Sequence, residues 1–148
     1  MAISKRATIL GDLKTAMEAI TTDNEFQSDV AKVMRGIQPE SAFTGNMPGL
    51  AIWNERGPRE NMAQGYSERT LIIHIWGYVP VAAEIGNYDA LDKLAADVET
   101  CLMTPARWAY FGFTEIGDTV YYEGGVEDPI GIFDMTVAVS YNYAFASP

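Results

Sequence analysis

Few side chains in this sequence could carry acid–base, nucleophilic or metal chemistry. The chain contains one histidine, His74, which lies within an apolar, β-branched stretch. A histidine that acts as a general base needs a nucleophile or an acid within hydrogen-bond reach, and the spacing around His74 identifies neither. We therefore expect His74 to be a structural residue of a strand. A small enzyme that uses His74 is the least favoured of the functional alternatives.

The remaining candidates for chemistry point to no metal or cofactor. The single cysteine, Cys101, lies on the apolar stripe of a predicted helix, where a thiol behaves as a small hydrophobic group. One cysteine and one histidine cannot supply the four ligands of a zinc site. The acidic residues Glu123, Glu127 and Asp128 lack the alternating spacing of a calcium loop. We predict that the protein binds no metal or cofactor and is not an enzyme.

Length and composition indicate one folded domain that spans residues 1–148. Apolar residues make up 48% of the chain and charged residues 20%, which is typical of globular proteins. No apolar run reaches the ~18 residues of a membrane span, and the first ten residues lack the apolar segment of a secretory signal. A lone cysteine excludes an internal disulfide and fits a reducing compartment.

The charge balance bears on nucleic-acid binding. Acidic residues outnumber basic ones by 20 to 10, so the formal net charge is −10. Proteins that grip DNA release its counterions with clustered lysines and arginines. Non-specific DNA binding is therefore not expected. The charge is compatible with another role, in which DNA passes an acidic surface without adhering to it.

The stretch Glu68–Val79 is the element around which the other segments are arranged. Its side chains alternate with the period of a strand. One set is aliphatic, with Gly77 as a gap, and should face the core: Leu71, Ile73, Ile75 and Val79. The other set mixes polar and aromatic groups, and we expect another sheet or another subunit to cover part of it: Thr70, Ile72, His74, Trp76 and Tyr78.

Two helices and further strands should surround this central strand. Apolar residues at three- and four-residue steps predict helices over Ser4–Ile20 and Tyr88–Met103. Strands are predicted at Ser28–Arg35, Leu50–Glu55, Trp108–Ile116, Asp118–Gly124 and Gly131–Phe145. The polar segment Arg56–Tyr66 reads as a long exposed connection. The order predicts an α+β fold, with two helices packed on one face of a mostly antiparallel β-sheet in a ring-forming subunit.

Aromatic residues are numerous for one small domain. We expect more than half of nine of them to fill the core, and the remainder to mark an interface, because large exposed apolar patches are usually contact sites. The nine are Trp53, Trp76, Tyr78, Trp108, Tyr110, Tyr121, Tyr122, Tyr141 and Tyr143.

Taken together, the order of these segments resembles the tail terminator (minor tail, tail-completion) proteins of long-tailed bacteriophages. The resemblance covers nearly the whole chain and is one of pattern, without a catalytic signature. It rests on the N-terminal helix, the polar hairpin and four further stretches. These stretches are Met47–Ile52, Leu71–Val79, Ala90–Glu99 and Phe133–Tyr141.

The resemblance implies a virion structural protein that is assembled in the host cytoplasm. Six copies would form a ring at the head-proximal end of the tail tube, end tube polymerisation and offer a docking surface to the neck. The implied partners are the protein itself, the tail tube protein and a neck or head-completion protein, with no membrane. DNA would pass through the ring, and six copies would carry a formal charge of 6 × −10 = −60, which repels phosphate.

Contacts between subunits are expected along sheet edges and the polar connection. The candidate interface residues are Arg56, Arg59, Glu60, Tyr66, Arg69, Trp76 and Tyr78. A ring built from such contacts would be cyclic and heterologous. The alternative from the same particle is a neck or head-completion adaptor that lies between portal and tail.

Overall fold

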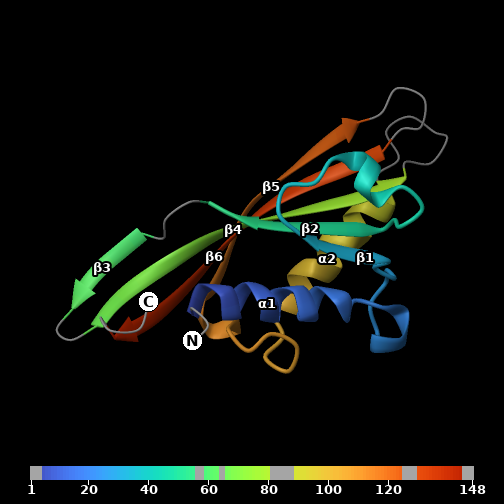
Figure 1. The fold of residues 1–148 in the computed structure, drawn as a ribbon. Coiled ribbons are helices and arrows are strands. Elements are labelled where there is room, and N and C mark those ends of the chain that lie inside the picture. The colour runs from blue at the N-terminus through green and yellow to red at the C-terminus, as the bar shows by residue number, and fades with distance from the viewer. Residues whose placement is uncertain (1–4, 56–58, 64–65, 81–88, 125–129, 145–148) are drawn as a thin grey trace.

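The computed structural model describes residues 5–55, 59–63, 66–80, 89–124 and 130–144 (Figure 1). At residue 40 and in strand residues 59–63, 66–69, 123–124 and 142–144, the description is limited to the backbone. The helices are α1 (Lys5–Glu18) and α2 (Asp89–Leu102), with short 3-10 helices η1 (Thr22–Asn24), η2 (Glu40–Phe43) and η3 (Phe111–Phe113). The strands are β1 (Lys32–Arg35), β2 (Gly49–Asn54), β3 (Arg59–Ala63), β4 (Tyr66–Pro80), β5 (Thr114–Gly124) and β6 (Ile130–Ala144).

The strands form one mostly antiparallel sheet, which confirms the predicted α+β class. Five strands lie side by side in the order β1-β2-β4-β6-β5, and β3 pairs separately with β4. Only the β1–β2 pair is parallel among the described pairs. The predicted central strand is β4, which pairs with β2, β3 and β6. In Figure 1 the ends of β4 and β6 extend with β3 away from α2.

Both helices cover one face of this sheet, as the periodicity predicts. The α2 stripe is buried, and α1 buries five residues that include Ile9, Leu13 and Met17. They pack on the aliphatic set of β4 and on the alternating apolar face of β6, and eight members of these two sets are at most 2% exposed. These β-strand members are Leu71, Ile73, Ile75, Val79, Phe133, Met135, Val137 and Val139.

Three predicted segments differ from the structure. The segment Arg56–Tyr66 is not a single loop, because residues 59–63 form β3 and Tyr66 begins β4. The two strands predicted at 108–116 and 118–124 are one strand, β5, whose register shifts between Ile116 and Thr119. A bulge of this kind bends a strand without ending it. The first predicted strand is shorter than expected and comprises only Lys32–Arg35.

The opposite sheet face, here called the open face, is covered at one end by the chain itself. Phe43 of η2 is fully buried and stacks on Tyr78, with ring centroids 4.6 Å apart. Met34, Met47, Trp76 and other partly buried residues pack around this pair. The segment before β2 therefore covers this end of the open face, and the expectation that another sheet or subunit covers part of the face stays a prediction.

The prediction that most of the nine aromatic residues fill the core is wrong. Three of them, Tyr78, Trp108 and Tyr141, are at most 7% exposed. Tyr121 and Tyr122 are 45% and 50% exposed, and Trp53, Trp76 and Tyr110 are half-buried. Tyr143 lies among the residues whose side chains are not described.

Candidate functional site

His74 is held between two carboxylates on the open face. Its Nδ1 lies 2.9 Å from Oδ1 of Asp134, and its Nε2 lies 3.0 Å from Oε2 of Glu55. The imidazole also stacks on Trp53, with ring centroids 4.2 Å apart and planes 7° from parallel. Trp76 meets the other side of this group, edge-on to Trp53 at 5.9 Å. The site therefore ties together β2, β4 and β6.

Strand register brings these residues together. Trp53 lies directly opposite His74 in the β2–β4 pair, and Asp134 lies opposite Trp76 in the β4–β6 pair. Side chains two residues apart on one strand share a face, so the four groups converge on the same side of the sheet. Glu55 follows β2 directly and reaches the imidazole from there.

The two carboxylates favour the charged form of the imidazole. Partial burial alone would lower the pKa of His74, but the hydrogen bonds that the imidazolium donates to Asp134 and Glu55, together with the negative charges of these carboxylates, outweigh it. The pKa of His74 is therefore raised above its usual 6.5. Because both ring nitrogens bind carboxylates, His74 is suited to clamping three strands and is poorly suited to accepting a substrate proton.

The sequence spacing identifies no acid near His74, whereas the structure places two carboxylates against its ring. Its two partners lie 19 and 60 residues away in sequence, and only the sheet register brings them close. The signal that could have found Asp134 is the strict alternation of the last strand, which places it on the face of Thr136 and Ile132. Both hydrogen bonds that the imidazole makes in the described part of the chain go to carboxylates.

Cys101 is buried, as the sequence predicts. It is 1% exposed, and its thiol donates to the carbonyl oxygen of Ala16 at 3.7 Å. Burial raises the pKa of the thiol to about 11, despite the opposing charge of Arg107. A thiol with this pKa is protonated at neutral pH and is a weak nucleophile.

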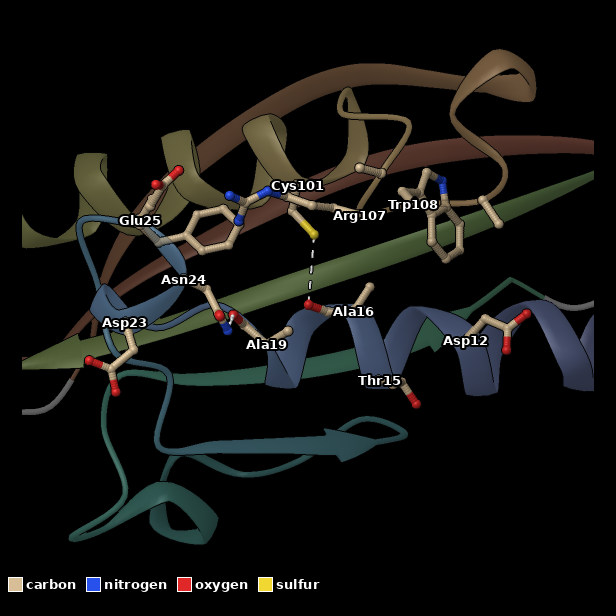
Figure 2. A pocket seen from close by; sticks show the side chains of 13 residues that line it. Asp12, Thr15, Ala16, Ala19, Asp23, Asn24, Glu25, Cys101, Arg107 and Trp108 are labelled. Atoms are coloured by element: carbon tan, nitrogen blue, oxygen red, sulfur yellow. Dashed lines mark hydrogen bonds between the residues drawn. The ribbon is translucent and has the colours of Figure 1, made fainter.

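A groove of about 610 Å³ lies between α1 and the loop that follows α2 (Figure 2). Its lining combines carboxylates, among them Asp12 and Glu25, with one guanidinium. That guanidinium belongs to Arg107 and lies 4.1 Å from the centre of the Phe26 ring. Cys101, whose thiol is protonated at neutral pH, also lines the groove.

The absence of a metal site stays a prediction. Among the described residues, no group of three or more histidine, cysteine or acidic side chains could hold a metal ion. Two of the acidic residues weighed as a cation site, Glu127 and Asp128, lie outside the described residues. For Glu123, only the backbone is described.

The structure separates the seven predicted interface residues. Trp76 is half-buried beside the His74 cluster, whereas Tyr78 is 1% exposed beneath Phe43 and offers almost no surface to another chain. Arg59, Glu60, Tyr66 and Arg69 lie in the paired strands β3 and β4, where only the backbone is described, and Arg56 lies outside the described residues.

Comparisons with known proteins give no family. Within the described residues, no helix is long and apolar enough to cross a membrane. No protein-family model matches the sequence, and no curated protein matches it.

Proposed function

We propose that this protein is a structural subunit of a phage virion that forms a ring at the head-proximal end of the tail tube. The ring ends tube polymerisation and gives the neck a docking surface, while DNA passes through it. The resemblance in segment order supports this proposal, and so does the net charge of −10. An acidic ring repels phosphate, which keeps moving DNA from adhering.

The observation that carries the proposal is the unequal character of the two sheet edges. In the described structure β5 pairs only with β6, and β1 pairs only with β2, so each leaves one side without a strand partner. Val120, Tyr121 and Tyr122 of β5 are 45–50% exposed in a row. An open edge with such apolar side chains is a template for pairing with another chain.

Charge distinguishes these edges further. The β1 edge carries the exposed cations Lys32 and Arg35, and the β5 edge carries the exposed anions Glu115 and Asp118. Opposite charges on opposite edges favour contact between the β1 edge of one copy and the β5 edge of the next. Such a head-to-tail contact is heterologous and forms a ring when its rotation closes.

A charge exchange tests this arrangement. Replacing Lys32 and Arg35 with glutamate should reduce the assembled mass at micromolar concentration, because like charges then face each other across the contact. Replacing Glu115 and Asp118 with lysine should do the same, and combining both pairs of changes should restore assembly. Lys93→Glu, on the exposed side of α2, is the matched control and should leave the mass unchanged.

The place in the particle needs a second experiment. Electron microscopy of tails assembled without this protein should show over-long tubes, whereas headless tails of normal length would favour the neck adaptor. Arg56→Glu with Arg59→Glu should weaken ring assembly if the predicted polar connection contributes. A strictly monomeric protein that also fails to cap purified tail tubes would overturn the proposal.

A further inference from the structure

Next to the Phe43–Tyr78 pair, the open face carries a compact group of aromatic and acidic side chains. This indole–carboxylate patch consists of Trp53, Trp76, Glu55 and Asp134 around His74. The two indole rings stand at 86° to each other, and both residues are half-buried. The patch therefore presents aromatic surface in two orientations within reach of carboxylate oxygens.

The charge of this patch is not cancelled internally. Two carboxylates contribute −2 and the imidazolium contributes +1, so the group retains a net charge of −1 while His74 is protonated. The imidazole contacts one oxygen of each carboxylate, Oδ1 of Asp134 and Oε2 of Glu55. Glu55 is 52% exposed, so its carboxylate is open to solvent.

The apolar surroundings extend the patch towards β5. Val120 lies opposite Asp134, and Tyr122 lies opposite Ile132, which places both on the open face. They are 47% and 50% exposed. A negatively charged centre with an apolar margin suits a protein side chain that is both cationic and able to stack.

We propose that the indole–carboxylate patch docks an arginine side chain of a partner protein. A guanidinium is planar, stacks on indole faces and forks onto carboxylates, whereas the ammonium of lysine is a compact, strongly hydrated charge. Because the patch is negatively charged, it disfavours nucleic-acid phosphate and favours a basic protein segment as its occupant. The inference goes beyond the tail-ring proposal and does not depend on it.

The three tryptophans provide the test and its internal control. The indole nitrogens of Trp53 and Trp76 are buried and have no hydrogen-bond acceptor among the described residues. A guanidinium stacked on the exposed part of either ring changes the electronic environment of that ring, so both indole signals should respond to bound arginine. The indole of Trp108 donates to Thr114 at 2.8 Å within the helix-covered core, where Trp108 is 1% exposed. N-acetyl-arginine amide should move the Trp53 and Trp76 indole signals saturably in NMR spectra and leave that of Trp108 in place.

Neutral and charge-removing controls decide the outcome. N-acetyl-citrulline amide keeps the shape of the probe without its charge and should give no saturable shift. Glu55→Gln should weaken arginine binding about fivefold, the factor that corresponds to an exposed charged pair. Glu18→Gln on α1 is the matched control, since Glu18 is also 52% exposed, and should leave binding unchanged. Equal shifts with citrulline, or undiminished binding by Glu55→Gln, would overturn the proposal.

Discussion

Replacing Gly77 with alanine should destabilise the fold, because a buried ring occupies the space that a methyl group would need. Gly77 lies directly opposite Phe133 in the β4–β6 register, and Phe133 is fully buried. A Cβ atom at Gly77 would stand 2.5 Å from Cζ and 2.6 Å from Cδ2 of that ring, well inside van der Waals contact. The gap in the aliphatic set of β4 is therefore a slot for an aromatic side chain.

The expected cost follows from how little the ring can move. Protein interiors are close-packed, and overpacked cores lose about 1–3 kcal/mol. We expect Gly77→Ala to fall at the upper end of this range, because the methyl group would meet three ring carbons at once. Gly11→Ala is the control, since a Cβ there meets nothing within 4 Å, and it should stabilise α1 by up to about 1 kcal/mol.

Urea denaturation monitored by tryptophan fluorescence measures these differences. Phe133→Leu should open the slot, so the double variant Gly77→Ala with Phe133→Leu should lose less free energy of unfolding than the two single changes together. For residues in contact, a coupling of about 1 kcal/mol is the expected size. Costs that add within about 0.3 kcal/mol, or a Gly77→Ala variant as stable as the parent protein, would refute the packing argument.

Three further predictions concern the imidazole, the thiol and the covered end of the open face. An NMR titration should place the pKa of His74 above 6.5, and Glu55→Gln should lower it; an unshifted value would contradict the clamp. The pKa of His74 is higher in the folded state than in the unfolded state. Its contribution to the free energy of unfolding should therefore be complete below about pH 6.5 and should be lost as pH rises through the folded-state pKa. Cys101 should react with a thiol reagent at pH 8 only after unfolding, and stoichiometric labelling of the folded protein would contradict its burial. Gly49→Ala should cost about 1–3 kcal/mol in urea denaturation, since its Cβ would lie 2.7 Å from Cε1 of Phe43, and a neutral effect would show that this ring can move.

The sequence predicts best where one periodicity decides the element. Helix α2 repeats its apolar residues at the helical period over about four turns, and strand β6 repeats its apolar residues at every second position over about seven pairs. Both elements lie within one or two residues of the predicted bounds. The same holds for β4, whose aliphatic set is buried without exception. These elements are recognisable because burial of one face, rather than a distant partner, selects their residues.

The sequence predicts poorly where a neighbouring strand decides the element. Strand β3 reads Arg-Glu-Asn-Met-Ala, a composition with little β preference, and it forms through five-residue pairing with β4. Gly117 and Asp118 look like a break between two strands, but β6 runs past them and holds both halves of β5 in one ladder. His74 shows the same limit at the level of a site, because its partners depend on register across three strands.

Residues on the open face differ in burial because the chain itself covers only one end of this face. Tyr78 and His74 lie on the same face of β4 and are equivalent in the sequence pattern. Tyr78 is nevertheless only 1% exposed, whereas the side chain of His74 is 16% exposed. The difference arises from the segment before β2, which brings Phe43 onto Tyr78, where Gly49 leaves room for the ring. Next to this covered end, Trp53 and Trp76 are half-buried, and the side chain of Glu55 is 52% exposed. The sequence pattern therefore identifies the face, whereas the segment before β2 determines how deeply its residues are buried.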